Sequence, residues 1–217
     1  MAGAVRSPRG KGRQARSYHV GNLREGFVRE ALGLLDREGL DALSLRKVAA
    51  AAGVSHAAAY RHFDDKSALL AAVAEEGFGL LYEYQQQVVA DCGDDLAARF
   101  LELGWIYVKF AIDHPQHARV MFSGAGLEFR RYPELQAAAA RSFRMLLEVV
   151  RRGQERGLMA PGRAKQQTLA AWSMVHGVAL LVLDGQIHLR GEPDEVEAKV
   201  KSVIGCLNTG LRGPASA

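Results

Sequence analysis

Apolar residues recur along most of the chain at steps of three and four, which is the spacing of one face of an α-helix. In residues 23–38, for example, Phe27, Ala31 and Leu35 share such a face, and Gly39 follows as a stop signal. No segment alternates Val, Ile or Thr with polar residues in the way that a half-buried strand does. The pattern therefore predicts an all-α protein.

The same spacing predicts a series of helices after residue 63. They are expected over residues 66–90, 95–113, 117–122, 133–156, 166–187 and 194–211. Asp64 or Asp65 can cap the first of them. The 166–187 helix is apolar nearly all round, which indicates burial on most of its faces. Gly177 and Gly185 both lie on this expected helix and would allow another helix to approach closely.

Residues 44–63 predict two short helices joined by a tight turn, the geometry of a DNA-reading helix-turn-helix. Ser44 and Ser55 precede the two helices and can cap them, because the N–H groups of a first turn have no partner within the helix. Gly53 stands where the turn requires a residue with positive φ. The second helix is expected to carry residues 56–62.

This part of the chain also carries a family resemblance. The string from Gly39 to Val73 resembles the N-terminal domain of the TetR family of bacterial transcriptional regulators. The positions that match the family pattern are Ser44, Leu45, Arg46, Val48, Ala49, the run Ala52-Gly53-Val54-Ser55, Tyr60, Phe63, Lys66 and Leu69-Leu70. Ala58 departs from the pattern, since many members have Gly there. The resemblance implies a three-helix DNA-binding head followed by a larger helical domain that binds a ligand and dimerises.

The positive charge of the chain is concentrated toward its N-terminus. The formal net charge is +4, and residues 1–22 hold five basic residues and no acid. The rest of the chain is close to neutral, and no acid lies between Asp41 and Asp64. The basic N-terminal segment is either a disordered, solubilising leader or an arm that follows DNA phosphates or enters a minor groove.

Two groups of side chains in the helix-turn-helix are candidates for DNA contact. The candidates for base edges in the major groove are Ser55, His56, Ala57, Ala58 and Arg61. The candidates for phosphate oxygens, which fix register without reading sequence, are Ser44, Arg46, Tyr60, His62 and Lys66. An arginine can bond to guanine through two hydrogen bonds, and alanine methyls can meet thymine methyls. The sequence reading is therefore expected to come chiefly from His56 and Arg61.

The chain is divided into four segments by this interpretation. They are a basic disordered arm (1–22), the helix-turn-helix domain (23–67), a helical effector-binding and dimerisation domain (68–211) and a disordered tail (212–217). The third segment is far larger than a plain dimeriser needs, so it is expected to bind a small apolar effector. A ligand that favours one spacing of the two heads would change DNA affinity through the connecting 66–90 helix.

Aromatic and soft residues in the larger domain are typical of the lining of a ligand pocket. The candidates are Trp105, Phe110, Met121, Phe122, Phe143, Leu146, Trp172 and His176. Taken singly, each of them also fits a hydrophobic core. The string from Trp172 to Gly177 resembles a Trp-x-x-x-His-Gly signature of one TetR subgroup. His176 can be a satisfied structural histidine or the polar anchor of the pocket.

The two C-terminal helices predict a homodimer. Their apolar content exceeds what one small bundle needs, so they are expected to form half of a four-helix interface, as the resemblance also implies. The alternative is a monomer whose last helix packs inward. A dimer would hold two recognition helices about 34–36 Å apart, or at a nearby spacing, on a palindromic double-stranded DNA operator.

Catalysis has little support in the sequence. His114 and His117 flank a proline that breaks the helical spacing of metal ligands, and no third ligand is near. There is no Ser/His/Asp order, no phosphate-cradling Gly loop and no paired-carboxylate motif. The sequence therefore predicts no catalytic residue, metal or cofactor. The expected function is a ligand-responsive repressor, and the alternative is an architectural or effector-independent DNA-binding protein.

A cytoplasmic location is expected from composition. Apolar residues make up 48% and charged residues 24% of the chain, as in ordinary soluble proteins. The apolar run of residues 169–183 contains a histidine and is too short to cross a bilayer comfortably, so no membrane partner is expected. Cys92 and Cys206 lack metal-ligand spacing and fit a reducing compartment, with a redox-sensing pair as the alternative.

Overall fold

A computed structural model describes residues 23–122 and 127–211, and all regular structure in these ranges is helical. The elements are α1 (Leu23–Glu38), α2 (Leu45–Ala51), α3 (His56–Tyr60), α4 (Lys66–Asp91), α5 (Leu96–Asp113), α6 (Pro115–Phe122), the 3-10 turn η2 (Phe129–Arg131), α7 (Pro133–Glu155), α8 (Ala164–Leu183) and α9 (Pro193–Leu211). The predicted all-α fold is confirmed. The expected N-terminal arm and C-terminal tail lie outside the described residues.

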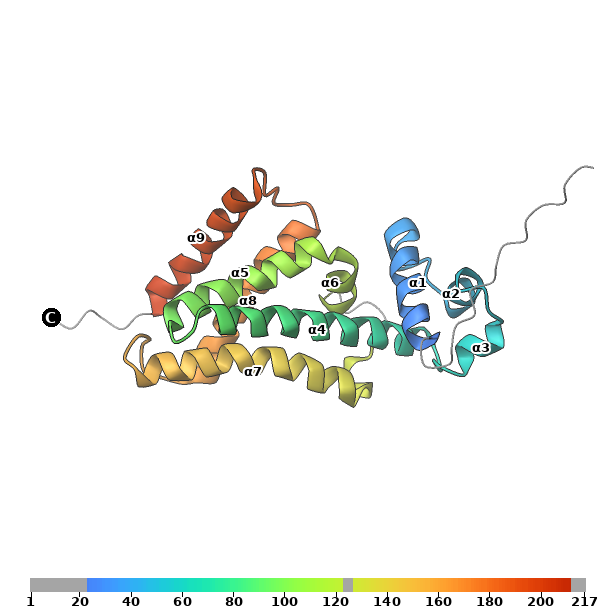
Figure 1. Ribbon diagram of the computed structural model, residues 1–217, viewed down its shortest axis with the longest axis horizontal. Helices are drawn as coiled ribbons and strands as arrows, with labels where there is room; N and C mark the ends of the chain where they lie inside the picture. The colour runs from blue at the N-terminus through green and yellow to red at the C-terminus, as the bar shows by residue number, and fades with distance from the viewer. Residues whose placement is uncertain (1–22, 123–126, 212–217) are drawn as a thin grey trace, which may run out of the picture.

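The helices divide into a small head and a longer body (Figure 1). The head is residues 23–65, which contain α1–α3, and the body is α4–α9. The 26-residue α4 begins beside the head and runs along the body between α5, α6 and α7. The domain boundary expected after residue 67 therefore falls at the start of one continuous helix.

The turns of the head have the capping that the sequence predicts. Ser44 Oγ accepts a hydrogen bond from the Lys47 amide at 3.3 Å, and Ser55 Oγ accepts one from the Ala58 amide at 3.3 Å. Gly53 has a φ of 70°, the left-handed conformation that the tight turn requires. These local bonds satisfy first-turn amides and fix where α2 and α3 begin.

A compact apolar core holds the head together. Phe27 on α1, Val48 on α2 and Ala59 on α3 have no exposed surface. Phe63 packs edge-on against Phe27, with ring centroids 5.9 Å apart. Asp65 then caps α4, because its Oδ1 accepts from the Ala68 amide at 2.8 Å. The core therefore joins α1, α2 and α3 directly to the start of α4.

Two helices end two or more residues before the position that the sequence predicts. The helix α3 ends at Tyr60, so Arg61 is its C-cap and His62 lies beyond it. The helix α8 ends at Leu183 and not at residue 187. Gly185, with a φ of 68°, follows the C-cap, because a glycine relieves the strain of a left-handed helix end.

The expectation that Gly185 shares a helix with Gly177 is wrong, because α8 ends at Leu183. Within one chain, apart from the adjacent residues and the backbone of α8 itself, nothing lies within 4 Å of the position that a Cβ on Gly177 would take. The close approach of a partner helix at Gly177 therefore stays a prediction. Within the chain, a close approach of two helices occurs on α5. A Cβ on Gly104 would lie 2.7 Å from Ile204 Cδ1, so this glycine lets α9 pack against α5.

Candidate DNA-binding surface and ligand cavity

Most of the candidate DNA contacts lie on the outside of the head. The exposed side chains are Arg46, Ser55, His56, Ala57, Tyr60 and Arg61. His56 and Tyr60 are one helical turn apart on α3, and their rings meet edge-on with centroids 4.7 Å apart. Tyr60 is 50% exposed, which is unusual for a large aromatic side chain that has a core available nearby. An exposed, polar-tipped face of this kind suits contact with nucleic acid.

Ala58 does not belong to that exposed face. It is only 7% exposed and packs inside the head beside the fully buried Ala59. A buried methyl group cannot reach a thymine methyl, so the expectation of a base contact by Ala58 is wrong. The reason is helical geometry, since residues 56, 57 and 60 face outward and residues 58 and 59 face the core.

Three of the candidate phosphate contacts are partly engaged within the head. Ser44 is the half-buried cap of α2, and His62 is half-buried with its ring 5.7 Å from that of Phe27. Lys66 Nζ donates to the carbonyl oxygen of Leu40 at 2.7 Å. In this arrangement the Lys66 ammonium holds the α1–α2 loop to the start of α4, because its charge satisfies a carbonyl of that loop.

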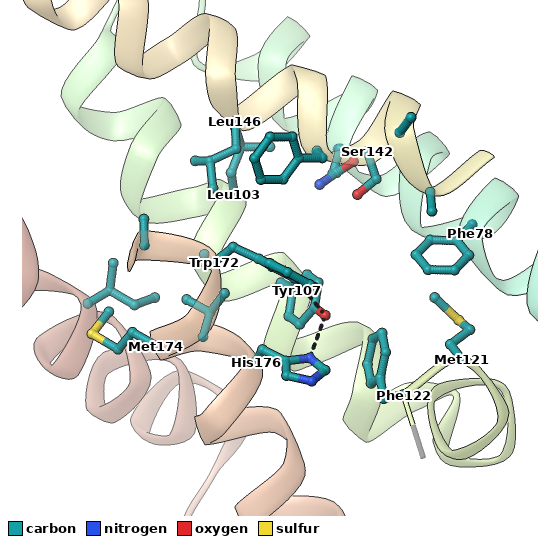
Figure 2. A pocket seen from close by; sticks show the side chains of 18 of the residues that line it. Phe78, Leu103, Tyr107, Met121, Phe122, Ser142, Leu146, Trp172, Met174 and His176 are labelled. Atoms are coloured by element: carbon teal, nitrogen blue, oxygen red, sulfur yellow. Dashed lines mark hydrogen bonds between the residues drawn. The ribbon is translucent and has the colours of Figure 1, made fainter. Parts of the chain in front are cut away.

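The body contains a cavity of about 570 Å³, open on one side to solvent and lined mainly by α4, α5, α7 and α8 (Figure 2). The predicted pocket residues that line it are Met121, Phe122, Phe143, Leu146, Trp172 and His176. A volume of this size is within the range of pockets that hold drug-sized molecules, about 300–1,000 Å³. The cavity is mostly apolar, as the sequence predicts.

Two predicted pocket residues lie elsewhere. Phe110 is fully buried on α5, with its ring 5.1 Å from that of His114 and 6.3 Å from that of Tyr84. Trp105 is 7% exposed and belongs to the hydrophobic core. Neither side chain lines the cavity. Both are core residues, the alternative that the sequence left open for every candidate.

The structure adds lining residues that sequence reasoning missed. They are Phe78, Gln85, Phe100, Leu103, Gly104, Tyr107, Phe129, Gln136, Ala139, Ala140, Ser142, Ala171, Met174, Val175 and Ile204. Some of them could have been found from spacing. Phe100, Leu103, Gly104 and Tyr107 recur at steps of three and four on α5, so they share one face. Others, such as Gln85, carry no signal of their own in the sequence.

A polar network crosses the aromatic wall of the cavity. Tyr107 Oη lies 2.9 Å from His176 Nδ1, and Trp172 Nε1 donates to Tyr107 Oη at 3.1 Å (Figure 2). An indole N–H can only donate, so the tyrosine oxygen accepts it and its own hydrogen is free to reach His176. The Tyr107 ring also stacks on Phe122, with centroids 5.4 Å apart and planes within 16°. These contacts hold the wall in one arrangement.

The two titratable side chains of the wall are held uncharged. Burial raises the pKa of Tyr107, and the hydrogen bond from Trp172 offsets this only in part. Burial also lowers the pKa of His176 below its usual value. Desolvation disfavours a charged form in both cases. At neutral pH the wall therefore presents a phenol and a neutral imidazole.

Two histidines outside the cavity contact α4: His114, the C-cap of α5, and His117 on α6. His114 Nε2 lies 3.0 Å from Tyr84 Oη, and His117 Nε2 lies 3.1 Å from Glu76 Oε1. Burial, together with the nearby His117, lowers the pKa of His114. In both pairs the Nε2 atom of the histidine contacts a side chain on α4. The geometry thus gives these histidines a packing role.

Comparison with known proteins agrees with this two-part geometry. A family model described as bacterial regulatory proteins of the tetR family matches residues 27–73. A second model, described as the tetracyclin repressor-like C-terminal domain, matches residues 100–204. The chain belongs to the TetR family. TetR proteins are transcriptional regulators and not enzymes, and they bind DNA operators, typically as homodimers that respond to small molecules.

Solved structures share the fold of this chain. A protein of unknown function from a Rhodococcus species is 34% identical, with a TM-score of 0.76 over 91% of this chain and 100% of that one. The fatty acid degradation regulator FadR from Bacillus halodurans is 18% identical, with a TM-score of 0.72 over 91% of this chain and 100% of its own. The TetR regulator PfmR from Thermus thermophilus is 20% identical, with a TM-score of 0.66 over 86% and 99%. A comparison with curated sequences finds no significant match. The Trp-x-x-x-His-Gly subgroup stays a prediction.

Proposed function

We propose that this TetR protein is a homodimeric repressor that binds a palindromic operator through α3 and releases it when a small apolar molecule fills the cavity. The observation that carries the proposal is the connection between cavity and head. Two separate segments of the body line the cavity and also contact the head or the start of α4. A molecule that moves the cavity wall would therefore act on the position of the head.

The first connection is α6. Met121 and Phe122 at its C-terminal end line the cavity. Near its N-terminal end, Gln116 Nε2 donates to Asp36 Oδ1 on α1 at 3.0 Å. A Cβ on Gly77 of α4 would lie 2.4 Å from Met121 Sδ, so α6 packs very closely on α4. Displacement of these two side chains by a ligand is therefore expected to shift α6 against α1 and α4.

The second connection is η2. Phe129 lines the cavity, and the neighbouring Arg131 donates from Nη1 to Asp65 Oδ2 at 2.8 Å. Asp65 is also the cap of α4, and its bond from the Ala68 amide, together with Arg131, lowers its pKa. The segment therefore connects the cavity to the residue that fixes where α4 begins. The surface ion pair is a positional contact, because such pairs add little stability in water.

Dimerisation through α8 and α9 is supported by their exposed apolar side chains. Leu169, Trp172 and Leu181 on α8 are 50%, 37% and 37% exposed, and Val203 on α9 is 45% exposed. The helix α8 is also apolar and long enough to cross a membrane by composition and length alone, and only 22% of its apolar window is buried within the chain. A soluble regulator needs a partner for such a surface, and a second copy is the partner that this family typically provides.

For DNA contact we propose that Ser55, His56, Ala57 and Arg61 meet base edges, while Arg46 and Tyr60 meet phosphates. Ser44, His62 and Lys66 would then contribute through helix N-termini and packing more than through free side chains. The basic residues 1–22 are proposed to add phosphate contacts. Deletion of this segment is then expected to weaken binding evenly across sequences and to reduce its salt dependence.

The mechanism is a linkage between two binding equilibria. A ligand that binds more tightly to one arrangement of the heads must lower the population of the other. A ligand with equal affinity for both arrangements changes nothing, however tightly it binds. The proposal therefore requires a compound that both occupies the cavity and distinguishes the DNA-bound form from the free form.

The test begins with an operator selected from random DNA with the purified full-length protein. Compounds that raise the melting temperature are then titrated into the protein–operator complex, with fluorescence anisotropy as the readout and sedimentation to give the oligomeric state. We expect a dimer, one palindrome and at least one compound that weakens operator binding. Binding that follows salt and ignores sequence would favour an architectural protein, and no effect of any bound compound would reject the sensor.

A further inference from the structure

The lack of charged side chains in the cavity lining limits which kinds of ligand can bind there. The lining contains no Asp, Glu, Lys or Arg. Tyr107 and His176, its two titratable residues, already bond to each other. An ionised ligand group placed among these side chains would lose its water without gaining a counter-charge, which is unfavourable. An uncharged molecule meets no such penalty.

One buried polar atom of this wall lacks a hydrogen-bond partner among the described residues. Gln85 on α4 is 4% exposed and lines the cavity, and its Oε1 is fully buried without a hydrogen bond among the described residues. Buried amides are almost always bonded, because an unpaired polar group costs the free energy of its lost hydration. An unpaired amide in the wall of a cavity is explained when the cavity's occupant supplies the missing bond.

The chemistry of an amide defines the matching group. A glutamine side chain has a carbonyl acceptor and an NH₂ donor, and the two ends can exchange by rotation about χ3. A hydroxyl or an amide on the ligand can donate to one end or accept from the other. A carboxylate can only accept, and it brings a charge that no lining side chain balances.

We propose that the cavity selects an uncharged, mainly aromatic or aliphatic molecule whose hydroxyl or amide group hydrogen-bonds to the Gln85 side chain. The inference rests on the proposed function only in treating the cavity as a ligand site. The aromatic wall supplies the apolar contact, and Gln85 sets the orientation. This assigns to Gln85 the anchor role that the sequence considered for His176, whose Nδ1 lies within hydrogen-bond distance of Tyr107 Oη.

The test uses a matched set of probes that differ at one position. They are biphenyl, 4-phenylphenol and biphenyl-4-carboxylate, with the full-length protein at pH 7.5. Each displaces the neutral fluorophore N-phenyl-1-naphthylamine, whose own binding is measured first. We expect the phenol to bind at least about tenfold more tightly than the carboxylate. The free-energy cost of burying one unbalanced charge is larger than the free energy that corresponds to about a tenfold difference in affinity.

The role of Gln85 is tested with Gln85→Leu, which keeps the approximate size of the side chain. We expect the preference for 4-phenylphenol over biphenyl to fall by about tenfold, the value of one hydrogen bond in a buried site. Gln86→Leu is the matched control, since Gln86 is an exposed neighbour on the same helix. It should leave the preference unchanged. Thermal melting confirms folding of both variants, and Gln85→Leu is expected to melt no lower than the wild type.

The outcomes separate this inference from the proposed function. Binding of the carboxylate as tight as that of the phenol would overturn the selection for uncharged ligands. An unchanged preference in Gln85→Leu would overturn the anchor, and no displacement or binding by any probe would overturn both. If the phenol binds as expected but leaves operator affinity unchanged in anisotropy titrations, the ligand class stands and the regulatory function fails.

Discussion

The head and the body of this regulator differ in how completely their side chains fill the interior. In the head, Phe27, Val48 and Ala59 have no exposed surface, and each side chain fills the space left by its neighbours. In the body, longer helices leave about 570 Å³ unfilled between α4, α5, α7 and α8. Close packing makes an interior rigid, whereas an unfilled volume can change shape at lower cost. The difference suits a rigid part that reads DNA and a deformable part that senses a ligand.

Besides the apolar packing of the head on the start of α4, two polar pairs at the surface connect the two regions. Gln116 with Asp36 and Arg131 with Asp65 are exposed pairs. Each contributes little to stability, so each can be broken or re-formed with small changes in free energy. A switch needs two states that differ by only a few kcal/mol. Weak connections between a rigid head and a deformable body meet that need.

The largest expected effect comes from truncating an aromatic residue in the head. Phe27→Ala should destabilise the protein by about 3–5 kcal/mol, because the close-packed core cannot fill the space that is left. Phe143→Ala in the cavity wall should cost clearly less, since that ring already borders an unfilled volume. Chemical denaturation of the two variants measures both values. Equal losses would contradict the contrast between the two regions.

Next in size is the expected effect on DNA binding. Arg61→Ala should weaken binding to the selected operator by about 1–3 kcal/mol and relax the preference at one base pair, because a bidentate contact to guanine is lost. Arg151→Ala removes another exposed arginine, on α7 and far along the chain from the head, and should leave the affinity unchanged. Anisotropy titrations on the operator and on single-base variants measure both. Wild-type affinity and preference in Arg61→Ala would reject Arg61 as a reader.

The head could be predicted almost completely from its sequence, because its structure depends on local rules. Ser44, Gly53 and Ser55 act within one or two turns of the chain, and each has the cap or the φ that its residue type predicts. The errors there are also local. Arg61 falls one residue past the end of α3, and Ala58 faces the core where only an exposed helical face was expected.

The cavity could be predicted only in part, because it is made by helices that meet from distant parts of the chain. Aromatic content identified Phe122, Trp172 and other wall residues, but it also selected Phe110, which lies in the core. Residue type cannot distinguish a core ring from a wall ring. Gln85 was missed because a glutamine in the middle of a helix usually lies on the exposed face, so the sequence does not indicate that this one is buried. Only the packing of α4 against its neighbours makes that amide buried and unpaired.

A smaller effect is expected from filling the cavity. Ala140→Leu adds a larger side chain to the cavity wall. The affinity for N-phenyl-1-naphthylamine should therefore fall by about tenfold or more, while operator binding persists. The melting temperature should stay equal or rise, since the added methyl groups enter space that is already present. Ala137→Leu, an exposed site on the same helix, is the control. A large loss of stability confined to Ala140→Leu would mean that the volume is not available.

The smallest expected effect is on the pH dependence of stability, to which a buried histidine of the body contributes. His56 in the head is exposed, whereas burial in the body lowers the pKa of His176 below its usual value of 6.5. Below that pH the unfolded chain binds a proton that the folded protein resists, so stability falls as the pH decreases. Melting temperatures between pH 7.5 and 5.5 should therefore decline less steeply in His176→Gln than in the wild type. His188→Gln changes an exposed histidine and should keep the wild-type slope. Equal slopes in all three proteins would show that the burial of His176 does not contribute to the pH dependence of stability, and the contrast between the cavity wall and the exposed head would fail at this residue.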